Sequence, residues 1–140
     1  MSLIIEMLRQ HEGVRTHAYK CTSDNTTIGV GRNIDENGGI GLSADETDYL
    51  LANDVKRVEA ELIAAFNWYK MLNDARKDAR MDMCFNMGLP RLRKFKRALA
   101  AMSANLYEIA AVEFLDSLWA KQVGHKRSTT ISEMIRTGEY

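Results

Sequence analysis

The sequence has little cysteine, almost no proline and no net charge. Its 140 residues include two cysteines and one proline, and 19 basic side chains balance 19 acidic ones. Two cysteines are too few for the disulfide framework of a small secreted scaffold, so we expect Cys21 and Cys84 to be free thiols. A net charge of zero lacks the basic footprint of a nucleic-acid binder, so no nucleic-acid partner is expected. The length suits one compact domain, and 46% hydrophobic residues suffice for a core.

Long hydrophobic runs are also missing. Glu6 and Arg9 interrupt the apolar N-terminus well before it reaches the length of a signal peptide or a membrane span. We therefore expect a protein that is made in the cytoplasm and has neither a signal peptide nor a transmembrane segment. If its substrate lies outside the inner membrane, another protein must let it through.

One segment departs from the even charge balance. Residues 91–97 contain five basic side chains and no acidic one. The ordinary interpretation is a solvated helix face or loop rim. The alternative is a patch that attracts a polyanion. The sequence leaves both interpretations open.

The first third of the chain predicts a helix followed by a hairpin. Ser2 can cap a helix over residues 2–12, and Gly13 can end it, which places Glu12 on the last turn. Residues 14–35 lose the helical period and gain residues typical of strands, with a turn near Asp24.

The rest of the chain predicts helices alone. Ser43 and Glu46 match a capping box that opens a long helix. Beyond about residue 64 every periodic segment is helical. The further helices that we expect are one from Asn73 to Gly88, one over about 91–102, one capped by Asn105 with Trp119 near its end, and one from about Arg127 to Ile135.

The spacing of three residues near the N-terminus is the most informative motif. Eight residues separate Glu12 from Cys21, and five separate Cys21 from Thr27. This pattern resembles the active-site signature of the phage-type lysozymes, or endolysins, of glycoside hydrolase family 24. Ordered matches continue through Thr27-Ile28-Gly29-Val30-Gly31, Phe85-Asn86-Met87-Gly88 and Arg136-Thr137-Gly138, so the resemblance covers nearly the whole chain.

The resemblance implies an α+β, mainly α, lysozyme-like fold. Residues 1–140 would form a single lysozyme domain, in which a small N-terminal lobe over about 13–60 carries the catalytic hairpin. A long helix would join it to a larger all-helical lobe over about 61–140, which also includes the helix over 2–12. We expect a monomer.

The resemblance also assigns catalytic roles. Glu12 would be the general acid, and the negative end of its helix together with partial burial would favour the protonated form. Cys21 stands at the second catalytic position, where Asp is more familiar, and could act as base, as nucleophile or as a mere spacer. Lys20 or another cation could favour its thiolate form, whereas the bland alternative is a small half-buried side chain. Thr27 would help to hold the attacking water, which implies inversion of the anomeric carbon.

Other positions are assigned to substrate binding. Arg32 and Asn33 follow the glycines, where the wall of the cleft should be, although the family often has His at position 32. Phe85 resembles a sugar-contacting aromatic residue, but its helical spacing suits a core residue equally well. At Ala98 and Glu113 the chain departs from the family's other glycan contacts.

The resulting prediction is an endolysin muramidase. It would hydrolyse the β-1,4 bond between N-acetylmuramic acid and N-acetylglucosamine in bacterial peptidoglycan during host cell lysis. No cofactor is implied, and His11, His17 and His125 are too dispersed to suggest a metal site. A holin would be the functional partner that gives passage through the membrane to the periplasm.

The alternative is a peptidoglycan-binding relative in which Cys21 has weakened or removed catalysis. Glu12 and Thr27 argue against it, because a pure binder has little need for an acid at that position. A lysozyme module within a phage tail is disfavoured, because the chain has no room for attachment domains.

Overall fold

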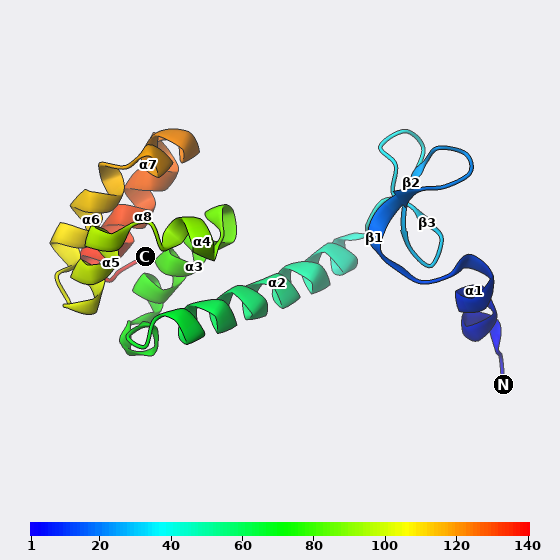
Figure 1. Ribbon diagram of the computed structural model, residues 1–140, viewed down its shortest axis with the longest axis horizontal. Coiled ribbons are helices and arrows are strands. Elements are labelled where there is room, and N and C mark those ends of the chain that lie inside the picture. Colours follow the sequence, from blue (N-terminus) through cyan, green and yellow to red (C-terminus); the bar gives the residue numbers. More distant parts are fainter. The chain divides into compact units, whose positions relative to one another are not determined.

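The computed structural model describes residues 1–140, apart from the side chain of Leu118. The chain divides into two compact units, Met1–Leu50 and Leu51–Tyr140. Helices and one small antiparallel sheet make up the fold, which confirms the predicted α+β, mainly α, class (Figure 1). Among the described residues, no helix combines the length and apolar character needed to cross a membrane.

The first unit contains one helix and a three-stranded sheet with strand order β1-β2-β3. Its elements are α1 (Ile4–Glu12), β1 (Arg15–Lys20), β2 (Thr26–Gly29) and β3 (Arg32–Asn33). Thr27 lies opposite Tyr19 on one side and Asn33 on the other. Because β-branched residues favour the pleated backbone, the Thr-Thr-Ile run suits the central strand. The helix over residues 2–12 was predicted to join the helical lobe; here α1 is grouped with the sheet, and its place in that lobe stays a prediction.

Two tight turns shape the sheet. Between β1 and β2, the Cys21 N–H donates to the Asn25 carbonyl at 3.0 Å, and the Asp24 N–H donates to the Cys21 carbonyl at 2.9 Å. Asp24 has a φ of 62°, a left-handed conformation that Asp tolerates in turns. The turn therefore falls where the sequence predicted it. Between β2 and β3, Gly31 has a φ of 66°.

The predicted capping box is present at the start of α2 (Ala44–Ala65). The Ser43 N–H donates to Glu46 Oε2 at 2.9 Å, and the Glu46 N–H donates to Ser43 Oγ at 3.3 Å. These bonds satisfy two backbone donors that a helix start would otherwise leave free. The helix continues from the first unit into the second.

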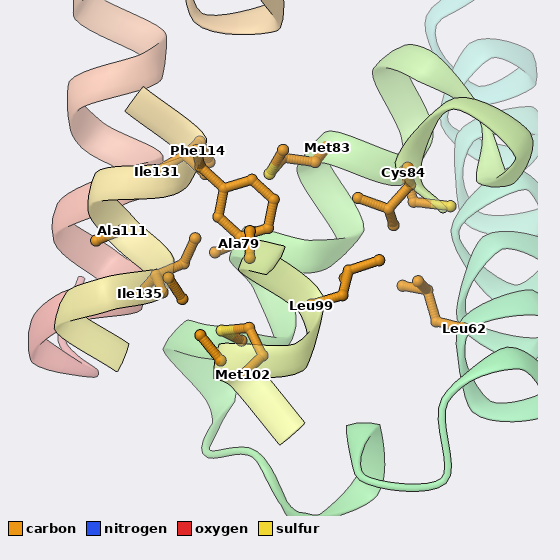
Figure 2. Packing of buried hydrophobic residues seen from close by; sticks show 14 of the residues in the cluster. Leu62, Ala79, Met83, Cys84, Leu99, Met102, Ala111, Phe114, Ile131 and Ile135 are labelled. Atoms are coloured by element: carbon orange, nitrogen blue, oxygen red, sulfur yellow. The ribbon is translucent and has the colours of Figure 1, made fainter. Parts of the chain in front are cut away.

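The second unit is all-helical. After α2 it contains η1 (Tyr69–Met71), α3 (Asp74–Met87), α4 (Leu89–Leu92), α5 (Lys96–Ser103), α6 (Tyr107–Leu115), α7 (Leu118–Val123) and α8 (His125–Thr137). As predicted, Asn73 caps α3 by accepting from the Arg76 N–H at 3.1 Å, and Gly88 ends it. The helices enclose one apolar core, in which Leu62, Met83 and Phe114 are fully buried (Figure 2).

Two predicted helices were wrong in detail. The helix over 91–102 is divided into α4 and α5, and Pro90 lies in the first turn of α4. Asn105 does not cap the next helix, because its φ of 61° places it in a left-handed turn and α6 begins at Tyr107. Trp119 belongs to the separate helix α7, whose start is capped by Ser117.

Candidate active site

Glu12 is the last residue of α1, as the sequence predicted. Gly13 ends the helix with a φ of 75°, and its N–H donates to the Arg9 carbonyl at 3.0 Å. The Glu12 carboxylate lies directly against Gly31, where a Cβ would stand 2.8 Å from Oε2 and 3.0 Å from Cδ. The expected partial burial is not found, because Glu12 is exposed and no residue of α1 is buried. The β2–β3 turn is thus the part of the sheet that Glu12 meets.

Cys21 follows β1 and is a half-buried free thiol. The backbone N–H groups of Asn25 and Ser23, together with the Thr27 hydroxyl, lower the pKa of the Cys21 thiol. Partial burial opposes this effect without reversing it. Donors that face the sulfur stabilise the thiolate because they bond to the charged form.

Lys20 is not the source of this effect, contrary to the possibility raised by the sequence. Its Nζ donates to Thr26 Oγ1 at 3.0 Å and lies 3.9 Å from Asp35 Oδ2. The Lys20 side chain therefore interacts with Thr26 and Asp35. The thiolate form of Cys21 is favoured mainly by neutral backbone N–H groups and not by the cation that the sequence suggested.

Thr27 is the buried member of the predicted catalytic group, with 3% of its surface exposed. Its hydroxyl donates to the Asn25 carbonyl at 2.9 Å. The same hydroxyl is within hydrogen-bonding reach of the Cys21 sulfur. Because a hydroxyl carries one hydrogen, it can donate to only one of these two acceptors at a time. Its two lone pairs can in addition accept a hydrogen bond from a water. The structure thus brings Cys21 and Thr27 together on adjoining parts of one hairpin.

Asp35 is a supporting residue that the sequence analysis missed. Its carboxylate accepts from the Thr26 N–H at 2.9 Å and from the Asn37 N–H at 3.0 Å. The Thr26 N–H is the main reason that the pKa of Asp35 is lowered, and Lys20 adds to it. Asp35 therefore fixes the start of β2 from outside the hairpin. A carboxylate two residues before Asn37 is typical of an Asx turn, and this spacing was the available signal.

Arg32 and Asn33 both have structural partners. The Arg32 guanidinium forms an ion pair with Glu46 and donates to the Gly41 carbonyl at 3.2 Å. Asn33 Oδ1 accepts from the Asp35 N–H at 2.9 Å. Both side chains thereby hold the loop that joins β3 to α2. Their predicted contacts with substrate stay predictions.

Phe85 lies in the second unit and is 47% exposed, so it is not a core residue. It lines a hollow of about 330 Å³ together with Val55, Met81 and Arg127. Arg127 forms an ion pair with Asp82 at 2.8 Å in the same hollow. Of the two interpretations that the sequence left open, the structure favours a surface contact. A contact with sugar stays a prediction.

Ala98 and Glu113 line a different hollow of about 340 Å³ in the second unit. Three cationic side chains, Lys94, Lys96 and Arg97, border it as well. The two positions at which the chain departs from the family's glycan contacts thus share one basic concave surface.

A family model described as phage lysozyme matches residues 9–133, which include Glu12, Cys21, Thr27 and Phe85. The chain belongs to the phage lysozyme family. This membership supports a glycosidase-type enzyme with a peptidoglycan-degrading role.

Several known proteins are similar to most of the chain. A probable T4-type lysozyme 2 of Dictyostelium discoideum is 30% identical over 99% of this chain and 96% of its own length. An endolysin of Acyrthosiphon pisum secondary endosymbiont phage 1 is 24% identical over 93% of this chain and 86% of its own length. The pre-baseplate central spike protein Gp5 of Enterobacteria phage T4 is 28% identical over 95% of this chain but only 27% of its own length.

Proposed function

We propose that this phage-type lysozyme is an inverting muramidase. It hydrolyses the β-1,4 bond between N-acetylmuramic acid and N-acetylglucosamine. The observation that carries the proposal is the placement of Cys21 and Thr27 on one hairpin, where hydrogen-bond donors that include the Thr27 hydroxyl lower the pKa of the Cys21 thiol. Glycoside hydrolysis needs an acid and a second group that activates water or attacks the sugar.

Glu12 supplies the acid in this proposal. Its carboxyl group donates a proton to the glycosidic oxygen as the bond to the anomeric carbon breaks. Its exposure leaves the carboxyl accessible to a sugar, and Gly31 permits its position because a glycine has no side chain there.

Cys21 and Thr27 supply the attacking water. The Thr27 hydroxyl and the Cys21 thiolate hold one water on the face of the sugar opposite Glu12. As the water oxygen bonds to the anomeric carbon, one of its protons passes to the thiolate. The products are a protonated Cys21, an ionised Glu12 and a sugar with inverted configuration, and proton exchange with solvent restores both groups.

The experiment compares the intact protein with Glu12→Gln on Gram-negative cells permeabilised with chloroform. The released fragments are reduced with borohydride and identified by mass spectrometry. We expect reduced muramic acid ends from the intact protein and their loss in Glu12→Gln. Glu6→Gln is the matched control, because Glu6 is an exposed acid on the same helix and its ion pair among the described residues is with Arg9.

The outcomes separate the proposal from its alternative. Reduced glucosamine ends, or full activity in Glu12→Gln, would contradict a muramidase with Glu12 as acid. Binding without cleavage by the folded intact protein would instead favour the weakened peptidoglycan-binding relative. Nuclear magnetic resonance of the first product anomer tests inversion, since a covalent Cys21 intermediate would give retention.

The proposed biological role is lysis of the host cell, with a holin as functional partner and no cofactor. Cells that express the protein with a holin should lyse, whereas cells that express it alone should keep their turbidity until chloroform is added. Lysis by the protein alone would contradict the need for a holin without affecting the proposed chemistry.

A further inference from the structure

Helix α6 of the second unit is apolar on both of its sides. Its inner side packs against α5 and α8, and Ala110, Ala111 and Phe114 are buried there (Figure 2). The nine residues of α6 include two charged ones, Glu108 and Glu113. A helix that is hydrophobic all round is ordinarily covered on all sides. The single chain covers only the inner side of α6.

The outer side of α6 carries large apolar side chains at every third position. They are Leu106, Ile109, Val112 and Leu115, and all four are exposed. Ile109 is 53% exposed and Val112 is 65% exposed. We call these four side chains the α6 stripe. Single apolar residues on a surface are ordinary, whereas neighbouring ones on one helix face indicate a place where another molecule binds.

The sizes of the side chains on the two sides of α6 point the same way. The inner side has the small residues Ala110 and Ala111, whereas the larger Ile109 and Val112 lie outside. Burial of apolar surface stabilises a fold in proportion to the area removed from water. The large side chains therefore contribute little to the stability of the single chain, and they contribute more once a second molecule covers them.

Charged side chains of both signs lie close to the α6 stripe. Glu113 is half-buried within α6, and Asp116 is exposed directly after it. Lys96 and Arg97 are exposed at the start of the neighbouring α5, where they line one hollow together with Glu113. Among the residues that the structure describes, the ion pairs involve none of these four. A partner with charges of one sign would be attracted by one pair and repelled by the other.

A second copy of the same chain fits a surface of this kind. In a two-fold symmetric interface both copies present the same patch, so an apolar centre with charges of both signs beside it can be complementary to itself. The chain has no net charge, so two copies do not repel each other at long range. An anionic lipid surface fits less well, because Glu113 and Asp116 would face its negative charge beside the apolar side chains.

We propose that the α6 stripe is the interface of a weak homodimer. A helix of nine residues is about 14 Å long, so its outer face supplies less area than the about 800 Å² per partner of a standard stable interface. The protein is therefore the monomer that the family resemblance implies when it is dilute, and it pairs at concentrations on the order of 0.1 mM. The inference does not rest on the proposed function, because Glu12, Cys21 and Thr27 belong to the first unit.

The test is sedimentation velocity of the full chain at concentrations from about 0.01 to 1 mM, a range that spans the expected dissociation constant. The stripe variant combines Ile109→Gln and Val112→Gln. The matched control combines Ile40→Gln and Met71→Gln, which remove two apolar side chains that are even more exposed from positions outside the stripe. Melting temperatures by circular dichroism establish that both variants are folded.

We expect the sedimentation coefficient of the parent protein to rise with concentration from that of a monomer toward that of a dimer. The matched control should behave like the parent, whereas the stripe variant should associate at least tenfold more weakly, because the surface that would be buried is now polar. A third variant, Glu113→Lys with Asp116→Lys, leaves the patch with positive charge alone. It should also associate more weakly, and added salt should reduce this effect because salt screens exposed charges.

A parent protein that stays monomeric over the whole concentration range would overturn the proposal. Equal association of the parent and the stripe variant would also overturn it, because the dimer would then form through another surface. Binding of the monomer to phosphatidylglycerol vesicles that is lost in the stripe variant would overturn it in favour of a lipid surface. The release of muramic acid ends is measured separately and tests the proposed function alone.

Discussion

The Thr27 hydroxyl donates to the Asn25 carbonyl, 2.9 Å away, and also helps to lower the pKa of the Cys21 thiol. Thr27 is buried, so these neighbours decide the orientation of its hydrogen. Asn25 also acts on Cys21 directly, because its N–H is the main cause of the lowered thiol pKa. Ionisation of Cys21 is thus coupled to the arrangement of one short turn.

The first prediction concerns the acidity of Cys21. Thr27→Val removes one of the donors and should raise the pKa of the thiol toward the ordinary value of about 8.5. The measurement is the rate of iodoacetamide alkylation against pH in a Cys84→Ala background, which leaves one thiol. In the parent the rate should rise with pH with a midpoint below the ordinary value, because the folded protein stabilises the thiolate. Thr26→Val, which changes the neighbouring half-buried threonine of the same strand, should leave the midpoint unchanged; an identical midpoint in Thr27→Val would exclude the hydroxyl as a cause.

The second prediction concerns the chemistry required at position 21. Cys21→Ser should reduce the hydrolytic rate by roughly a hundredfold or more, because a serine hydroxyl is not ionised at neutral pH. Cys21→Asp should retain activity, since its carboxylate would face the same N–H donors from Asn25 and Ser23. Rates of peptidoglycan solubilisation give the comparison. Equal activity of the Ser variant and the parent would remove Cys21 from the catalytic group.

The third prediction uses the contact between Gly31 and Glu12. In Gly31→Ala the new methyl group would stand 2.8 Å from Glu12 Oε2 and displace the carboxylate. Gly29→Ala is the matched control, because Gly29 has nearly the same φ, 69° against 66°, but open space around its Cβ position. Both variants should lose about 1–2 kcal/mol of stability through left-handed strain.

Only Gly31→Ala should also lose activity at a temperature where both proteins are folded. Thermal unfolding and initial rates on the same samples separate the two effects. If both variants lost activity equally, backbone strain and not displacement of Glu12 would explain the loss.

The elements that the sequence predicted well depend on local interactions. Ser43 and Glu46 lie three residues apart, and this spacing alone specifies the capping box. Asn105 shows the weakness of such reasoning, because Asn favours both helix caps and left-handed turns, and here the turn prevails. The prediction of one continuous helix over 91–102 was likewise wrong, because the chain is interrupted between α4 and α5.

The contacts that define the candidate site are not local. Glu12 meets Gly31 across 19 positions of sequence, and Arg32 meets Glu46 across 14. The hydrophobic periodicity of the sequence does not predict such contacts, because they depend on how the turns direct the chain. Spacing identified Cys21 and Thr27, but the backbone donors that lower the pKa of Cys21 became visible only in the folded turn.

The fourth prediction concerns the ion pair of Arg32 with Glu46. Glu46→Gln should lower the melting temperature at pH 7, because it removes the carboxylate that faces Arg32. The Arg32 guanidinium is the main cause of the lowered pKa of Glu46. The stability that the ionised Glu46 contributes is therefore fully present above the ordinary pKa of about 4.3, and it is lost as the pH falls through the lowered pKa. Melting curves of the two proteins should therefore converge as the pH falls from about 4.3 through the lowered pKa. Glu36→Gln, in an exposed loop, is the control and should match the parent at every pH; a constant offset for Glu46→Gln would contradict the ionic origin.

Arg80 is a buried charge that opposes folding. It is fully buried, and its Nε and Nη1 atoms have no hydrogen-bond partner among the described residues. Its guanidinium lies 3.9 Å from the centre of the Phe114 ring, and Nη2 is 3.0 Å from Met83 Sδ. Loss of hydration lowers the pKa of Arg80 to about 9. Below the folded-state pKa of about 9, the buried charge of Arg80 lowers the free energy of unfolding. The reason is that the unfolded chain binds this proton more tightly than the folded protein does.

The fifth prediction follows from the cost of that burial. Arg80→Met keeps an unbranched side chain of similar length and removes the charge, so it should stabilise the protein by about 1–4 kcal/mol at pH 7. Urea unfolding followed by circular dichroism gives the free energy of unfolding. Arg76→Met, one turn earlier on α3, is the matched control with the opposite expected sign. Arg76 donates to the carbonyls of Ile135 at 2.8 Å and Arg136 at 3.2 Å, so its removal leaves acceptors unpaired. Because the two substitutions are chemically identical, opposite effects on stability can arise only from what each guanidinium contacts. A destabilised Arg80→Met variant would contradict the prediction and would mean that Arg80 has an anionic or water partner in solution.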